Sequence, residues 1–185
     1  MPPEFKSFPK IPRLFSDGVI ISEKIDGTNG VIYIPEDDPT QIFAGSRTRW
    51  LAPGKEDNYG FALWVSQNKE ELLKLGPGRH FGEWWGCGIN RGYGLHERRF
   101  SLFNVHKWTD PEVRPKCCGV VPVLERHDVI STDRIKAALE SLSIRGSVAA
   151  PGYDKPEGIV VFHCRSNHLY KVLLENDDKP KNAFS

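Results

Sequence analysis

Short apolar or alternating segments, separated by turn residues, dominate this chain and are typical of β-strands. They span residues 19–22, 30–34, 41–46, 80–85, 100–108, 120–126, 158–164 and 169–174. Two longer segments, 59–75 and 132–145, have the 3.6-residue spacing of helices. Strands and helices do not alternate in a βαβ rhythm, so we expect an α+β fold of mainly antiparallel sheets with flanking helices. The hairpin-like spacing of the strands also predicts a groove between curved sheets.

The length of the chain favours one domain over residues 1–185, with a solvated tail at 176–185. A chain of 185 residues can bury a core without disulfides, and its four cysteines show neither disulfide nor metal-site spacing. The formal net charge of +1 argues against a strongly basic surface that coats nucleic acid. No apolar run suits a signal peptide or a membrane span, so we expect a cytoplasmic protein without membrane contact.

Residues 22–29, Ser-Glu-Lys-Ile-Asp-Gly-Thr-Asn, place a lysine at the end of an apolar strand and an Asp-Gly turn directly after it. A lysine amine that is buried or flanked by cations can lose its proton near neutral pH and become a nucleophile. A hairpin turn with a surface lysine explains the same residues, so this segment alone does not distinguish a catalytic lysine from a surface lysine. The chain has no P-loop motif, and side chains must therefore hold the phosphates of any bound nucleotide.

Four further segments carry polar or aromatic residues that suit a nucleotide site. They are Gly-Glu-Trp-Trp-Gly at 82–86, Phe-Ser-Leu-Phe-Asn-Val at 100–105, Pro-Glu-Gly-Ile-Val-Val at 156–161 and Leu-Tyr-Lys-Val at 169–172. Each segment alone is weak evidence for a nucleotide site. Trp84, Trp85 and Phe103 could equally be core residues, and an acidic residue beside glycine is common in turns.

Together and in this order, the five segments resemble the covalent nucleotidyltransferase superfamily of polynucleotide ligases and capping enzymes. EKIDGTN, FGEWWG, FSLFNV, PEGIVV and LYKVL match its motifs I, III, IIIa, IV and V. The sequence is most similar to the ATP-dependent RNA ligase branch, which includes phage RNA ligases and RNA-editing ligases. The resemblance implies a nucleotidyltransferase fold, the ATP-grasp-like adenylation domain of ligases.

The resemblance also implies an activity in RNA repair, with ATP and Mg²⁺ or Mn²⁺ as cofactors and RNA as partner. Lys24 is then the nucleophile that attacks the α-phosphorus of ATP, forming lysyl-AMP and releasing pyrophosphate. AMP passes to the 5′-phosphate of a strand, and a 3′-hydroxyl finally displaces it. Lys171 of motif V is the second catalytic lysine, placed on the α-phosphate. Such phosphoryl transfer depends mainly on positioning and on neutralising charge.

Further residues of this sequence take roles in nucleotide binding from the same resemblance. Glu83 is similar to the acid that binds the ribose hydroxyls, and Phe103 to the ring that stacks on adenine. Glu157 is similar to the acid that helps to hold the divalent ion, since Mg²⁺ and Mn²⁺ prefer oxygen ligands.

Around the nucleophile, Asp26 and Gly27 belong to motif I itself. Glu23 is expected to read the adenine edge through its backbone. Arg47 is favoured over Arg49 as the arginine that contacts the nucleotide or its phosphates.

The sequence departs from the family pattern at several points. Leu173 stands where motif V often has a second lysine, which Lys179 or Lys181 would have to replace, and Asn104 stands where motif IIIa usually has aspartate. Only 14 residues follow Lys171, so we expect a minimal form without a C-terminal domain.

The nucleic-acid substrate would then be bound with the help of a partner protein or by a local patch of basic residues. The candidate residues are Arg91, Arg98, Arg99, Lys107, Arg114 and Lys116. The sequence leaves open a minimal DNA ligase, a GTP-using capping enzyme, and a noncatalytic nucleotide- or RNA-binding module. It does not choose between sealing nicks and joining single strands.

Overall fold

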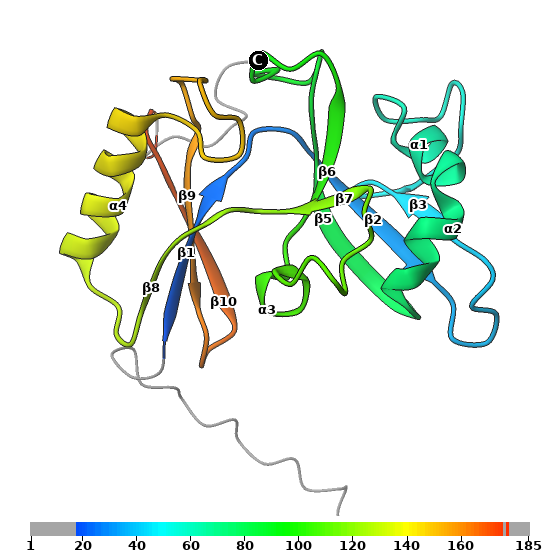
Figure 1. Cartoon of the computed structure of the whole chain (residues 1–185), viewed down its shortest axis with the longest axis horizontal. Helices are drawn as coiled ribbons and strands as arrows, with labels where there is room; N and C mark the ends of the chain where they lie inside the picture. Colours follow the sequence, from blue (N-terminus) through cyan, green and yellow to red (C-terminus); the bar gives the residue numbers. More distant parts are fainter. Residues whose placement is uncertain (1–17, 176, 178–185) are drawn as a thin grey trace, which may run out of the picture.

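Two sheets stand side by side in the computed structural model, which describes residues 18–175 and 177 (Figure 1). The first has four strands in the order β10-β9-β1-β8 and is antiparallel throughout. Its strands are β1 (Val19–Lys24), β8 (Val123–His127), β9 (Gly158–His163) and β10 (His168–Leu173). Residues from both ends of the described chain therefore meet in one sheet.

The second sheet has six strands in the order β4-β3-β2-β5-β6-β7. Its strands are β2 (Thr28–Ile34), β3 (Phe43–Gly45), β4 (Trp50–Leu51), β5 (Gly78–Gly86), β6 (Arg98–Leu102) and β7 (Cys118–Val120). All neighbours pair antiparallel except β6 and β7, which are parallel. The two sheets are joined by two short connections, residues 25–27 between β1 and β2 and residues 121–122 between β7 and β8.

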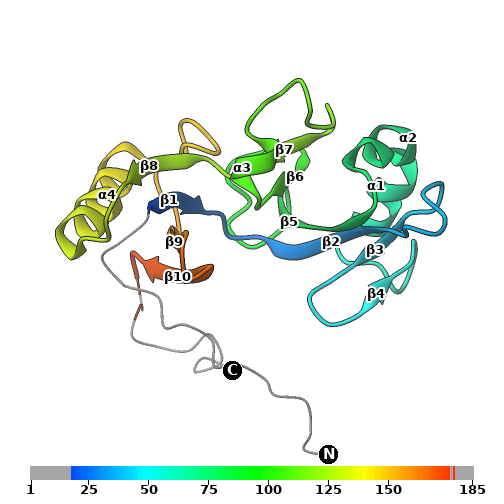
Figure 2. The same ribbon diagram turned by 90° about the horizontal axis from the view of Figure 1, so that it is seen from below.

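Helices cover one face of each sheet, and one short helix, at residues 105–108, lies between the sheets. The helical elements are α1 (Phe61–Gln67), α2 (Lys69–Leu72), η1 (Leu73–Leu75), α3 (Val105–Trp108) and α4 (Thr132–Arg145). In Figure 2, α1 and α2 lie on one side of the six-stranded sheet, and α4 lies beside the four-stranded sheet. The α+β class expected from the sequence is confirmed.

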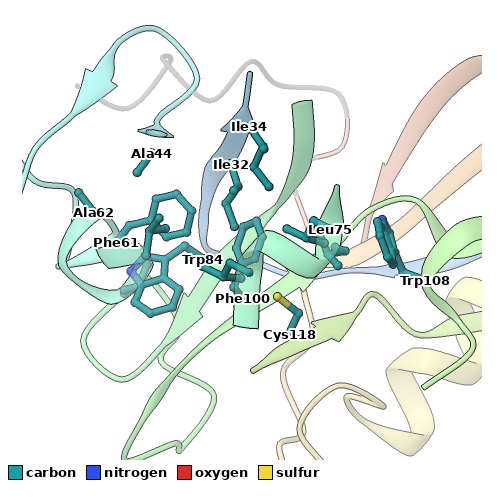
Figure 3. Close-up of a cluster of buried hydrophobic side chains, with 14 residues drawn as sticks. Ile32, Ile34, Ala44, Phe61, Ala62, Leu75, Trp84, Phe100, Trp108 and Cys118 are labelled. Atoms are coloured by element: carbon teal, nitrogen blue, oxygen red, sulfur yellow. The ribbon is translucent and has the colours of Figure 1, made fainter. Parts of the chain in front are cut away.

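The largest core lies between α1 and the six-stranded sheet. Strand alternation turns Ile32 and Ile34 toward Phe61 and Phe100, and these four side chains are at most 1% exposed (Figure 3). Gly30 lets the rings approach the strand, because a Cβ at this position would lie 2.7 Å from the Phe61 ring. Helix α4 packs in the same way on the outward residues of β1 and β9.

Three expected elements differ from the structure. The strand expected at 120–126 is broken at residues 121–122, where the chain passes from β7 in one sheet to β8 in the other. The strand expected at 100–108 is wrong beyond residue 102, because the Asn104 side chain accepts from the Lys107 N–H and caps the short helix α3. The helix expected at 59–75 is broken at Asn68, whose side chain donates to the Trp64 carbonyl. The tail expected at 176–185 lies outside the described residues, apart from Asp177.

Candidate active site

A cavity of about 1730 Å³ opens between the two sheets and is lined from both. In the four-stranded sheet, strand alternation turns one set of residues toward it, because paired residues on neighbouring strands share a face. These residues are Ile20, Ser22, Lys24, Val160, Phe162, Leu169 and Lys171. The opposite set, which includes Val19, Ile21 and Val161, packs in the core with α4.

Lys24 lies at the end of β1, and its Nζ donates to Oε2 of Glu157 at 2.6 Å. The pair is largely sheltered, with 18% of the lysine side chain and 6% of the glutamate side chain exposed. Gly158, the partner of Lys24 on β9, approaches β10 closely, because a Cβ there would lie 2.2 Å from the Val172 carbonyl oxygen. A lysine and an acid 133 residues apart are thus fixed side by side.

Glu83 on β5 faces the turn that follows Lys24. Its Oε1 accepts from the Gly27 N–H at 3.0 Å, and its Oε2 lies 3.4 Å from the Asn29 amide nitrogen. Burial raises the pKa of Glu83 to about 7, against the opposing effects of the Gly27 N–H and the Lys24 charge. Position 27 must be glycine, since a Cβ would lie 2.4 Å from the Trp84 carbonyl oxygen.

Two of the predicted nucleotide residues direct their carboxylates into the protein. Glu23 is 1% exposed and accepts from the Ser147 hydroxyl at 2.6 Å and from the Val148 and Ala149 N–H groups at 2.8 Å. The Glu23 N–H donates to the Pro122 carbonyl, and Glu23 also lines the cavity, so contact of its backbone with adenine stays a prediction.

The carboxylate of Asp26 accepts from the Asn90 amide at 3.0 Å and lies 3.0 Å from Nε of Arg91. The backbone N–H of Asp26 donates to the Tyr93 hydroxyl. These contacts tie motif I to the loop after β5, and Asp26 does not line the cavity in the part of the chain that the structure describes.

The facing wall of the cavity comes from the six-stranded sheet and its loops. Phe103 follows β6 and is 40% exposed at the cavity. Arg47 and Arg49 reach the same space from the loop between β3 and β4. Arg49 donates to the Glu56 carbonyl at 2.7 Å, whereas Arg47 has no hydrogen bond or ion pair among the described residues.

Lys171 reaches the cavity from the edge strand β10, where it is exposed and in register with Val160. Leu173 pairs with Gly158, which in turn pairs with Lys24. An apolar side chain therefore holds the position where motif V often has its second lysine. Lys179 and Lys181 lie outside the described residues.

The basic residues expected to track phosphates do not form one patch along the cavity. Arg91 pairs with Asp26 and Arg99 with Glu97, and Arg98 donates to the carbonyls of Cys87 and Tyr59. Arg114 donates to the Trp108 carbonyl. Among the described residues, Lys107 is the one member of this group that lines the cavity.

Sequence reasoning missed Phe81 and Asn29, which also line the cavity. Phe81 lies two residues before Glu83 on the same strand, so period-two alternation could have placed it on the cavity face. The donation by Asn29 to Glu83 joins residues 54 positions apart, and no local pattern signals it.

A divalent cation fits this site if one carboxylate and a bound phosphate share it. The described residues contain no group of three or more His, Cys, Asp or Glu residues that could hold a metal ion. Glu157, which directly precedes β9, holds a carboxylate against the Lys24 amine at the edge of the cavity, although Glu157 is not itself among the described residues that line it. Mg²⁺ commonly binds through one or two carboxylates together with substrate phosphates.

Comparisons with known proteins bear on the fold and the family. The family model described as RNA ligase matches residues 17–173. A Naegleria gruberi RNA ligase solved with PPi superposes with a TM-score of 0.64 at 19% identity, over 86% of this chain and 50% of that one. A mutant of that ligase with ATP and Mn gives 0.63 at 19% identity, over 92% and 57%.

This chain therefore spans about half the length of the solved structures that it matches. A search of the curated proteins found no match. Among the described residues, no helix has the length and apolar character needed to cross a membrane.

Proposed function

This chain belongs to the RNA ligase family, and from this premise we propose that it is an ATP-dependent ligase that joins 3′-hydroxyl and 5′-phosphate ends of RNA. One structural observation supports this activity in addition to the family match. Lys24, whose amine is paired with Glu157, lines a cavity between the sheets, where Glu83, Phe103, Arg47 and Lys171 gather from distant parts of the sequence.

In the proposed first step, Nζ of Lys24 forms a bond to the α-phosphorus of ATP. Pyrophosphate leaves with the electrons of the broken P–O bond, and the amine gives up its proton, leaving a lysyl-AMP phosphoramidate. AMP then moves to a 5′-phosphate of RNA. Attack by a 3′-hydroxyl forms the phosphodiester and releases AMP.

The wall residues suit the parts of an adenosine phosphate. The carboxylate of Glu83 can accept hydrogen bonds from ribose hydroxyls, and the exposed ring of Phe103 offers a surface for the adenine. Arg47 has an uncommitted guanidinium for phosphate oxygens, and Lys171 lies on the cavity face of the sheet that carries the nucleophile. The carboxylates of Asp26 and Glu23 act on the nucleotide only indirectly in this proposal, by fixing the loops around motif I.

A divalent cation would be held by Glu157 and phosphate oxygens, and relatives solved with ATP and Mn support Mn²⁺ or Mg²⁺. When bound, the ion neutralises charge on the phosphates. Glu157 does not act as a proton donor in the proposed reaction. It aligns the amine of Lys24 until the nucleotide and the cation enter.

Labelling with α-phosphate-labelled ATP in Mn²⁺ or Mg²⁺ tests the first step. We expect label on the wild-type protein after denaturation, and none on Lys24→Ala, because no other amine occupies that position. Lys136→Ala, an exposed lysine of α4, is the matched control and should label like the wild type. Absence of label on the wild type with either ATP or GTP would contradict the enzyme, and label on Lys24→Ala would contradict the nucleophile.

The labelled protein is then incubated separately with nicked RNA, nicked DNA and single-stranded RNA. Transfer of AMP to RNA ends supports the RNA ligase. Transfer to DNA ends alone, or labelling by GTP alone, would favour the DNA ligase or the capping enzyme instead.

A further inference from the structure

A patch of exposed aromatic side chains covers the open face of the six-stranded sheet, next to the cavity. We define this aromatic patch as Tyr33, Phe43, Trp50 and Arg79. Trp50 is 51% exposed and Phe43 is 43% exposed, which is unusual for such large apolar side chains on a sheet. Because α1 and α2 occupy the other face of this sheet, neither helix covers the patch (Figure 2).

The strand register brings these residues together. Phe43 on β3 pairs with Tyr33 on β2, and Tyr33 pairs with Arg79 on β5, so the three side chains share one face. Trp50 on β4 pairs with Gly45, and a Cβ at Gly45 would lie 3.2 Å from the Trp50 ring. A glycine at this position therefore lets the indole lie over the sheet.

Arg79 joins the aromatic patch to the cavity. Its guanidinium lies 4.5 Å from the centre of the Tyr33 ring and 5.5 Å from that of Trp50. Arg79 also lines the cavity, as does the neighbouring Phe81 on the same strand. It forms no hydrogen bond or ion pair with a described residue, so its N–H groups are free to bind an anion.

The size of the cavity points to a second occupant beyond a nucleotide. Small-molecule sites usually enclose about 300–1000 Å³, and this cavity has about 1730 Å³. Arg79, a member of the patch, and Phe81 both line this cavity. Flat rings with a cation among them form the surface on which proteins stack successive bases of a single strand.

We propose that the aromatic patch binds the single-stranded RNA that leads to the joint, with bases stacked on Trp50 and Phe43 and a phosphate on Arg79. The proposal rests on the proposed function, because the cavity must receive an RNA end. RNA is the ligand of the patch in this proposal, and the alternative that the experiments distinguish is a second copy of this chain. Binding of this kind tolerates many sequences and weakens with salt.

Fluorescence anisotropy of a labelled uridine oligonucleotide tests the patch in the full chain. Trp50→Ala and Phe43→Ala should each raise the Kd by about thirtyfold, the middle of the range for loss of one stacked base. Trp50→Phe should restore most of the affinity. Ile144→Ala, which removes an apolar side chain that is 77% exposed on α4, should bind like the wild type.

Tryptophan fluorescence adds a direct readout of stacking. Trp84, Trp85 and Trp108 are at most 3% exposed and Trp64 is partly buried, so RNA should quench mainly Trp50. The quenching should disappear in Trp50→Phe although that variant still binds. Quenching that persists in Trp50→Phe would overturn the proposed contact.

Labelling by ATP separates this proposal from the proposed function. Trp50→Ala and Phe43→Ala should still accept label at Lys24, which also shows that they fold. Unchanged RNA affinity in both variants overturns the patch, whether or not the wild type is labelled. Conversion of a dimer to a monomer by these substitutions, with RNA affinity unchanged, assigns the patch to a second copy and overturns the RNA proposal.

Discussion

At the scale of single residues, the site is built from groups that satisfy one another. Glu157 accepts from the amine of Lys24, and Glu83 accepts from the Gly27 N–H. A cation at Glu157 or a ribose at Glu83 must compete with these internal partners. The two carboxylates therefore have distinct environments, a lysine amine at Glu157 and a backbone N–H at Glu83.

The shifted pKa of Glu83 predicts a dependence of stability on pH. Its pKa is 4.5 in the unfolded chain and about 7 in the folded protein, so between these values the folded protein keeps a proton that the unfolded chain has lost. The free energy of unfolding should therefore fall as pH rises through this window, by on the order of 3 kcal/mol for this group. Glu83→Gln should lack that fall.

Urea unfolding of the wild type and Glu83→Gln at about pH 4 and about pH 8 measures the difference. Glu56→Gln, at an exposed carboxylate, is the matched control and should follow the wild type at both values. A constant difference between wild type and Glu83→Gln across this range would show that Glu83 titrates normally.

At the scale of elements, periodicity predicted the strands and helices whose positions depend on their own residues. Alternation predicted β1, β2, β9 and β10 to within a few residues, and the i, i+3, i+4 spacing predicted α4. The two-residue strand β4 is too short to leave such a pattern. The break at Asn68 coincides with a side-chain hydrogen bond to the Trp64 carbonyl, which helical spacing does not reveal.

The resemblance supplied the candidate site residues, and their roles stay predictions; the partners of their side chains could not be predicted from the sequence. Glu23 sits beside the nucleophile in sequence, yet its carboxylate is bound to Ser147, 124 positions away. Asp26 is bound in the same way to Asn90, 64 positions away. Such contacts follow from how distant loops meet, and neither composition nor local spacing encodes them.

Helix α4 allows a test of its N-terminal cap. The Ser131 side chain accepts from the Arg134 N–H, so Ser131→Ala leaves that group without its protein partner. We expect it to lower the free energy of unfolding by about 1 kcal/mol. Ser143→Ala, at an exposed position inside the same helix, should be neutral or slightly stabilising. Equal effects of the two substitutions in chemical denaturation would argue against the cap.

At the scale of the whole molecule, the candidate nucleotide contacts come from both sheets. Lys24 and Lys171 belong to the four-stranded sheet, while Glu83 and Phe103 belong to the six-stranded sheet and the turn after it. Only residues 25–27 and 121–122 connect the sheets along the described chain. A nucleotide in the cavity would add contacts across this junction.

ATP with Mn²⁺ should therefore raise the Tm of the protein. Ligand at about 100 times its Kd adds about 2.7 kcal/mol to the free energy of unfolding. Chelating the metal should reduce the shift, and Phe103→Ala should reduce it at equal ATP. Leu63→Ala, at a position 47% exposed on α1, should show the wild-type shift. A shift in Phe103→Ala as large as in the wild type would remove Phe103 from the nucleotide site.

The pairing of β1 with β9 also affects the order of events during synthesis on the ribosome. The six-stranded sheet uses residues 28–120 and can form as that stretch emerges, whereas β1 gains its two partner strands only when residues 123–127 and 158–163 have been made. Until then Lys24 lacks both Glu157 and the strand that aligns it. In the proposed reaction, the candidate nucleophile Lys24 is therefore positioned only after β9 has been made.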